Sequence, residues 1–139
     1  MIVPKPETLD YLIDSQQMWL AEDQGKIVGS ISYQLLWNDT LCFQFFRVDT
    51  DYHDKKVGEK LLRKIESVAK EQGRSQLIVC ISKHNSLFAK LHEKFNFKRI
   101  GELLTEADNE IVYRKEIKWM SLNLCSIKPK VNQKKFEKN

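Results

Sequence analysis

The stretch LCFQFFRVDTDYHDKKVGEKLLRKIESVAKEQG, residues 41–73, decides the fold of this chain. Its first eight residues are rich in aromatic residues and strand formers. From Val57 onward the apolar residues recur at helical spacing with charged residues between them, and Gly73 stands where such a helix would end. The run QLIVCIS, residues 76–82, is mostly apolar without alternation, which is typical of a strand buried on both faces. Together these segments predict a strand, a crossover helix and a parallel neighbouring strand.

The rest of the chain supplies further strands and a second helix. In chain order, we expect a short helix within residues 1–16, strands at 17–22, 27–37 and 41–48, a helix at 86–95, and strands at 98–104 and 110–117. Short polar turns separate the first three strands, as in an antiparallel meander. Asn85 precedes the second helix and is suited to cap it. The sequence therefore predicts an α/β (α+β) fold with a mixed, mostly antiparallel sheet.

The size and composition of the chain fit one globular domain, since it has 139 residues of which 42% are apolar. It holds no uncharged apolar run of the roughly 18 residues that a membrane span needs, and MIVPKPETLDYL lacks the pattern of a signal peptide. We therefore expect a cytoplasmic protein with no membrane partner. Cys42, Cys80 and Cys125 lack the paired spacing of zinc sites and redox motifs, which indicates buried, reduced thiols and no metal site.

The net charge of +4 is confined to the end of the chain. Residues 119–139 hold five of the 23 basic residues and one of the 19 acidic residues, so residues 1–118 are balanced. A neutral body disfavours nucleic acid as a partner. The basic extension is most simply a solvated segment.

The segment HDKKVGE, residues 53–59, joins the third strand to the first long helix. The first N–H groups of a helix have no partner within it, and the helix dipole adds partial positive charge, so such a place attracts anions. Gly58 would let a phosphate approach the backbone closely. The charged side chains around this glycine are His53, Asp54, Lys55, Lys56 and Glu59. From these residues alone, a solvated loop without a ligand explains the pattern equally well.

Two segments in register point to a known family. VDTDYHDKKVGEKLL, residues 48–62, resembles the acyl-coenzyme A loop of the GNAT superfamily of N-acetyltransferases, in which a strand ending in valine leads to an aromatic residue, Arg/Gln-x-x-Gly-x-Gly/Ala and a leucine-bearing helix. NSLFAKLHEKFNFKRIG, residues 85–101, resembles the second recurrent segment of that family. The matching positions are Val48, Tyr52, Val57, Gly58, Leu61 and Leu62 in the first segment and Asn85, Ala89, Leu91, Glu93, Lys94, Phe95 and Phe97 in the second.

This resemblance covers residues 17–118 and implies a single acyltransferase-like domain at 1–118, followed by a basic C-terminal extension at 119–139. It implies a central parallel pair that splays open beside the loop, with helices packed on both faces of the sheet. It also implies acetyl-CoA as cosubstrate, with the pantetheine arm on the third strand and the pyrophosphate on the amides of residues 54–59. The implied coenzyme-binding residues are Phe46, Arg47, Val48, His53, Asp54, Lys55, Lys56, Val57, Gly58, Glu59 and Asn85.

The chain departs from the family pattern in the coenzyme loop. His53 stands where the family usually has Arg or Gln, and Lys56 stands where it usually has the first glycine. If Lys56 must adopt a positive φ, the loop is strained, although its ammonium group could bind phosphate from the rim. These departures predict a weakened affinity for the coenzyme.

The residues that would move protons also depart from the pattern. His92 occupies the position of the tyrosine that protonates the departing thiolate, and it is the candidate acid, with a packing histidine as the alternative. Gln44 stands where many relatives have glutamate, and a glutamine accepts no proton. The base is left open between Glu22, Asp49 and a chain of waters.

The segment before the first strand is shorter than in relatives of this kind, where it forms much of the acceptor site. We therefore expect an open acceptor cleft or one completed by a second subunit, which leaves a homodimer open. The sequence predicts an N-acetyltransferase that transfers an acetyl group from acetyl-CoA to a primary amine of an unidentified acceptor. The alternative is a catalytically inactive acyl-CoA-binding or regulatory module with the same fold.

Overall fold

The computed structural model describes residues 6–7, 10–11, 15, 17–106 and 108–118. Its elements, in chain order, are β1 (Met18–Asp23), β2 (Lys26–Trp37), β3 (Thr40–Val48), the 3-10 helix η1 (Thr50–Lys55), α2 (Val57–Glu71), β4 (Gln76–Ser82), α3 (Ser86–Lys94), β5 (Lys98–Leu103) and β6 (Glu110–Glu116). The six predicted strands and the two longer helices are confirmed. The short helix predicted within residues 1–16 lies mostly outside the described residues, and the extension 119–139 lies entirely outside them.

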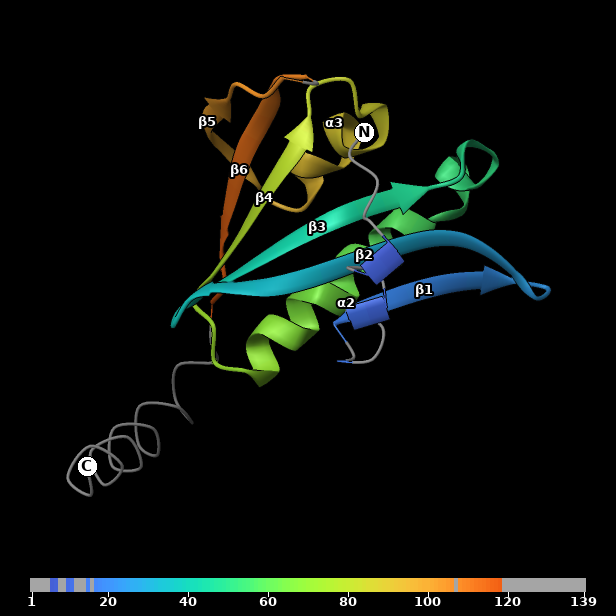
Figure 1. Cartoon of the computed structure of the whole chain (residues 1–139), viewed down its shortest axis with the longest axis horizontal. Helices are drawn as coiled ribbons and strands as arrows, with labels where there is room; N and C mark the ends of the chain where they lie inside the picture. Colours follow the sequence, from blue (N-terminus) through green and yellow to red (C-terminus); the bar gives the residue numbers. More distant parts are fainter. Residues whose placement is uncertain (1–5, 8–9, 12–14, 16, 107, 119–139) are drawn as a thin grey trace.

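The six strands form one sheet in the order β1-β2-β3-β4-β6-β5 (Figure 1). β1, β2 and β3 are antiparallel neighbours, as predicted for the meander, and β4 and β5 each pair antiparallel with β6. β3 and β4 run parallel, with α2 as the crossover between them. The mixed, mostly antiparallel sheet is thereby confirmed.

β3 and β4 separate part of the way along their length, as the splay visible in Figure 1 shows. They pair only where Thr40–Phe43 lies beside Gln76–Val79, although β3 continues to Val48 and β4 to Ser82. Beyond these pairs, each strand leaves a backbone edge toward the gap. The predicted splayed parallel pair is confirmed.

A β-bulge in β3 accompanies this separation. Phe45 and Phe46 stand opposite the single residue Ile31 of β2, and Phe45 has a φ of 52°. A bulge bends its strand and increases the local twist, so β3 turns away from β4. The hydroxyl group of the buried Ser32 donates to the carbonyl oxygen of Gln44 at 3.1 Å, which helps to hold the bulged strand against β2.

The core lies between the sheet and the two longer helices, which share one face. The buried residues of α2 are Gly58, Leu61, Leu62, Ile65, Val68 and Ala69. They join the same apolar cluster as Leu87 and Phe88 of α3. Phe43 of β3 is fully buried at its centre, and its ring contacts those of Phe46, Phe88 and Phe97. The apolar residues that recur at helical spacing from Val57 onward are thus largely the residues that α2 buries.

The opposite face of the sheet carries the first helical residues. Residues 6–7 and 10–11 are helical and are drawn in front of the sheet in Figure 1, on the side away from α2. This arrangement agrees with the expected packing of helices on both faces. Within the described ranges, no helix is long and apolar enough to cross a membrane.

Candidate functional site

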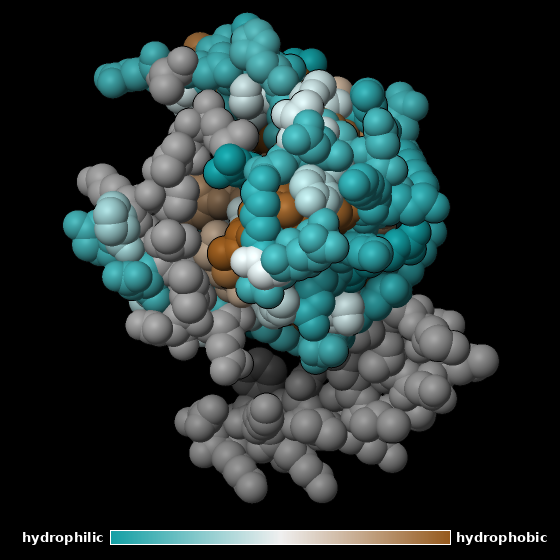
Figure 2. Space-filling view, turned by 90° about the vertical axis from the view of Figure 1, so that its right-hand side faces the viewer, coloured by the Kyte–Doolittle hydropathy of each residue, from teal (hydrophilic) through white to brown (hydrophobic). Residues whose placement is uncertain are grey.

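The separation of β3 from β4 opens two adjoining grooves. The first, of about 500 Å³, lies at the end of β3 between residues 46–53 and the start of α3. The second, of about 390 Å³, lies between the separated strands. Phe46, His84 and Asn85 line both grooves, so the two form one continuous depression. Figure 2 faces this end of the molecule and shows hydrophobic surface recessed between hydrophilic side chains.

The start of α2 offers free backbone donors. Gly58 lies close to Phe46 and Leu87 of the first groove, although residues 54–59 line neither groove, and Lys55 and Val57 line a separate pocket. Lys60 is the first residue of α2 whose N–H bonds back along the chain, to the carbonyl oxygen of Lys56 at 3.1 Å. No side chain caps the helix. The N–H groups of Val57, Gly58 and Glu59 are therefore available to an anion, and the helix dipole favours negative charge there.

The structure narrows the predicted anion site. The chain before α2 is a 3-10 helix, η1, where the sequence indicated a loop. Such a helix uses its N–H groups in its own i to i+3 bonds, so the amides of Asp54 and Lys55 are occupied. Of the predicted segment 54–59, the donors that remain belong to the first turn of α2.

Lys56 adopts the left-handed conformation that its position in the family pattern implied. Its φ is 62° and its ψ is 19°, and it links η1 to α2. The left-handed conformation costs free energy for any residue with a Cβ, because the Cβ crowds the backbone, whereas glycine adopts it freely.

We expect Lys56→Gly to stabilise the fold by about 0.5–1 kcal/mol in urea denaturation, because relief of the strained φ exceeds the entropy that glycine loses on folding. Lys55→Gly is the matched control, since Lys55 lies inside η1 and is not among the residues with positive φ. That control should be destabilising. Equal effects of the two substitutions would show that strain at Lys56 is not the cause.

Gly58 has a different role from the one predicted for it. A Cβ at Gly58 would lie 3.0 Å from Leu87 Cδ2, 3.2 Å from Leu91 Cδ1 and 3.3 Å from Phe46 Cζ. The missing side chain therefore faces the core, where it lets α2 approach α3 and β3. The prediction that Gly58 clears room for a phosphate was wrong about the direction of this space, although its N–H group stays available.

Four other predicted coenzyme-binding residues line the first groove, three from β3 and His53 from η1. Phe46, Arg47 and Val48 form the strand edge beside the gap. His53 Nε2 donates to the carbonyl oxygen of Val48 at 3.0 Å, so this histidine occupies one of the backbone groups expected to bind the pantetheine arm. Arg47 pairs with Asp49 at 3.6 Å.

Asn85 lies where the two grooves meet. Its side-chain Oδ1 accepts a hydrogen bond from the N–H of Phe88 at 2.9 Å, which confirms the predicted helix cap. The cap uses the oxygen of the amide and leaves the NH₂ group for a second partner. The side chain of Asn85 therefore caps α3 with its oxygen and lines the grooves at the same time.

His92, the predicted acid, lies outside the residues that line the two grooves. Its ring packs against Phe88 and Tyr113, with centroids 6.3 Å and 5.0 Å away, and its Nδ1 lies 3.3 Å from the carbonyl oxygen of Phe88. These contacts match the packing alternative. The structure does not bring His92 to the site, because α3 turns its side chain toward β6.

The candidate bases are dispersed. Asp49 lines the first groove, whereas Glu22 lies in a separate pocket between β1 and α2. Gln44 lines the second groove. The positions of Asp49 and Glu22 therefore do not converge on one reacting atom.

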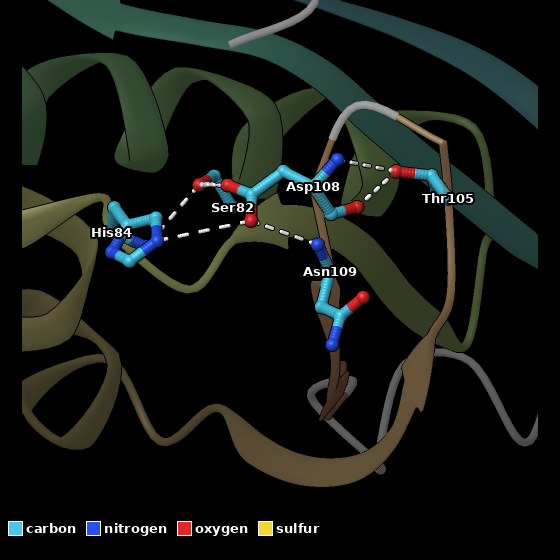
Figure 3. Close-up of polar contacts among 5 residues, drawn as sticks. All are labelled: Ser82, His84, Thr105, Asp108 and Asn109. Atoms are coloured by element: carbon cyan, nitrogen blue, oxygen red, sulfur yellow. Dashed lines mark hydrogen bonds and ion pairs between the residues drawn. The ribbon is translucent and has the colours of Figure 1, made fainter.

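The structure adds a polar cluster that sequence reasoning missed (Figure 3). Ser82 Oγ donates to Asp108 Oδ2 at 2.8 Å, and His84 Nε2 lies 3.8 Å from Asp108 Oδ1. The hydrogen bond from Ser82, with a further one from the N–H of Asn109, holds the pKa of Asp108 below its usual value. The cluster joins the end of β4 to the turn before β6, where Glu110 lines the second groove. In the sequence, the only signal for this cluster was the antiparallel pairing of the strands that became β4 and β6.

Cys42 and Cys80 are free thiols, as predicted, but they are only partly buried and line the second groove. Burial, with a smaller contribution from Cys80, raises the pKa of Cys42 to about 11. At neutral pH this leaves about 100-fold less thiolate than a cysteine of ordinary pKa. Cys42 is therefore a wall of the groove and a poor nucleophile.

We expect iodoacetamide to alkylate Cys42 about tenfold more slowly than glutathione at pH 7, because the higher nucleophilicity of a basic thiolate offsets part of its scarcity. The rate should rise with pH up to about pH 11. Mass spectrometry of the alkylated peptides gives the rate for each cysteine. A rate at Cys42 equal to that of glutathione would contradict the raised pKa of this thiol.

The comparisons with known proteins agree with this geometry. The model of the Acetyltransferase (GNAT) family matches residues 3–97. A probable N-acetyltransferase, camello, from Xenopus tropicalis is 28% identical over 83 residues, which are 58% of this chain and 38% of that protein. The chain thus spans less than half of this curated relative.

Among the residues that the structure describes, no group of three or more His, Cys, Asp or Glu side chains is placed to hold a metal ion.

Solved structures share the fold. The Ard1 structure from Thermoplasma volcanium superposes with a TM-score of 0.76 at 15% identity, covering 86% of this chain and 84% of that one. A GNAT family acetyltransferase from Elizabethkingia anophelis with acetyl-CoA bound gives a TM-score of 0.64 at 16% identity, covering 81% and 84%. With the family model matching well over half of its residues, this chain belongs to the GNAT acetyltransferase family.

Proposed function

We propose that the protein is an N-acetyltransferase that moves an acetyl group from acetyl-CoA to a primary amine. One observation carries this proposal: a continuous depression leads from the end of β3 and η1, which precedes the uncapped start of α2, into the opening between β3 and β4. Membership of an acetyltransferase family supports it. The similar fold of a structure with acetyl-CoA bound supports the choice of coenzyme.

In this proposal the diphosphate lies on the N–H groups of Val57, Gly58 and Glu59. The pantetheine arm runs through the opening and bonds the backbone of residues 46–48, whose edge has no pairing with β4. Asn85 donates to the arm through its side-chain NH₂ group. The side chains of His53, Asp54, Lys55 and Lys56 form the rim of the diphosphate site.

The amine of the acceptor attacks the thioester carbon directly, so the site must hold both reactants in one geometry. The depression provides one end for the coenzyme and one for the acceptor. Protonation of the thiolate by His92 stays a prediction from the family pattern, and the ring contacts of His92 with Phe88 and Tyr113 do not support it.

A second candidate is a noncatalytic module that binds acyl-CoA. The position of His92 outside the grooves favours it, and so does the hydrogen bond of His53 to the Val48 carbonyl. Both candidates require coenzyme binding and differ only in turnover.

Calorimetry with acetyl-CoA, followed by a thiol-release assay, tests these candidates. We expect binding, and release of free thiol with at least one member of a panel of n-butylamine, spermidine, an aminoglycoside and peptides bearing a free amino terminus or a lysine. S-acetylpantetheine, which lacks the diphosphate, is the control and should bind at least about tenfold more weakly. Binding without release would favour the noncatalytic module, and no binding would contradict both.

A further inference from the structure

Glu110 is the only carboxylate among the described residues that line the second groove. It is the first residue of β6 and lies opposite Ser82, the last residue of β4. At this point β4 has already lost β3 as a neighbour, so the carboxylate borders the opening between the strands. The face of β3 across the opening contributes Gln44, which accepts no proton.

The second groove is where the thioester would lie. In the proposed binding mode the diphosphate lies on the amides at the start of α2, directly after η1, whose residues line the first groove, and the two grooves join at Phe46 and Asn85. An extended arm that follows this path brings its far end between the separated strands. Glu110 therefore stands at the reacting end of the depression.

The surroundings of Glu110 favour proton uptake. Burial raises the pKa of its carboxyl group, and the nearby charge of Asp108 adds to the effect. Among the described residues, the titratable groups around it are Cys42 on β3, Cys80 on β4, His84 on the loop before α3 and Asp108 on the turn before β6. Burial raises the pKa of Cys80, and the charge of Glu110 adds to the effect. A carboxylate with a raised pKa is a better base near neutral pH.

The cluster in Figure 3 holds the backbone just before Glu110. The carboxylate of Asp108 accepts hydrogen bonds from Ser82 Oγ at 2.8 Å and from the N–H of Asn109 at 2.8 Å. The backbone carbonyl oxygen of Asp108 accepts a third hydrogen bond, from Thr105 Oγ1. These bonds tie the turn to the end of β4. The first residue of β6 is thereby held at the mouth of the groove.

We propose that Glu110 is the base that deprotonates the acceptor amine; this proposal rests on the proposed acetyltransferase function. Glu110 removes one proton from the ammonium group of the acceptor. The free amine attacks the thioester carbon, the C–N bond forms, and the C–S bond breaks as the tetrahedral intermediate collapses. The second proton of the nitrogen passes to the thiolate, and Glu110 returns its own proton to solvent.

The test compares Glu110→Gln and Glu110→Asp with the wild type, using acetyl-CoA and two nucleophiles in the thiol-release assay. One is the most active alkylamine of the panel above, which is protonated at neutral pH, and the other is hydroxylamine, which is not. We expect Glu110→Gln to lower kcat for the alkylamine by about 100-fold and for hydroxylamine by less than about threefold. Glu110→Asp should restore part of the alkylamine rate. We expect kcat of the wild type to rise with pH, and this rise should be absent in Glu110→Gln.

Glu106→Gln is the matched control, because Glu106 is exposed on the same turn and lies outside the residues lining the groove. It should leave kcat unchanged, and all variants should bind acetyl-CoA with wild-type affinity in calorimetry. Equal losses for both nucleophiles, or full activity of Glu110→Gln, would overturn the role of Glu110 alone. Wild-type protein that releases no thiol with any nucleophile would overturn the proposed function and this proposal with it.

Discussion

Replacing Phe43 with alanine should destabilise the fold by about 3–5 kcal/mol, the largest effect on stability that we expect from a single substitution. Phe43 is completely buried, and its ring lies 5.7 Å from that of Phe97, 6.2 Å from Phe88 and 6.4 Å from Phe46. Its removal would leave a cavity where β3, α3 and the segment after α3 meet. Domains of this size are stable by about 5–15 kcal/mol, so a loss of this size is readily measured in urea.

Trp37→Ala is the control for the loss of an aromatic ring, because Trp37 is 60% exposed at the end of β2. It should change the free energy of unfolding by less than about 0.5 kcal/mol. A cost at Phe43 as small as that at Trp37 would contradict the position of the core.

Gln44→Trp should weaken acetyl-CoA binding by roughly 100-fold, or about 2.7 kcal/mol. Gln44 lies on β3 and its side chain lines the groove between the separated strands. An indole ring there would fill the space proposed for the pantetheine arm. Tryptophan is a good strand former, so the substitution should leave β3 intact.

Gln44→Thr is the matched control, since threonine also suits a strand but is small. It should bind acetyl-CoA within about threefold of wild type by calorimetry. If Gln44→Trp also binds normally while its thermal unfolding is unchanged, the arm does not pass through this opening.

Most of the fold was predictable because its signals are local. The helical spacing of apolar residues from Val57 to Ala69 and the apolar run 76–82 each report one element within a few residues of sequence. The crossover between them then requires a parallel pair. The bulge at Phe45 was not predictable, because it depends on how Ser32 and Gln44 meet across two strands.

The candidate site was predictable in part. The start of α2 and the cap at Asn85 follow from local rules of helix termini. The role of Gly58 in the close packing of α2 against α3 does not follow from local rules, because its missing side chain faces Leu87, which is 29 positions away. Glu110 escaped sequence reasoning for the same reason, since the β4–β6 register alone places it beside Ser82.

His92 shows the limit of a family pattern. Its position in the chain matches a catalytic tyrosine of the resemblance, but its ring packs against Tyr113, far along the sequence on β6. Position in a motif fixes the element that carries a residue. The rotamer and the neighbours that decide its chemistry come from the rest of the fold.

The most direct test of the central claim is a crystal of the protein soaked with acetyl-CoA. We expect electron density for the diphosphate with its oxygens about 2.7–3.2 Å from the N–H groups of Val57, Gly58 and Glu59. Density for the coenzyme elsewhere, or a helix start that holds the ammonium group of Lys56 in place of a diphosphate, would contradict it.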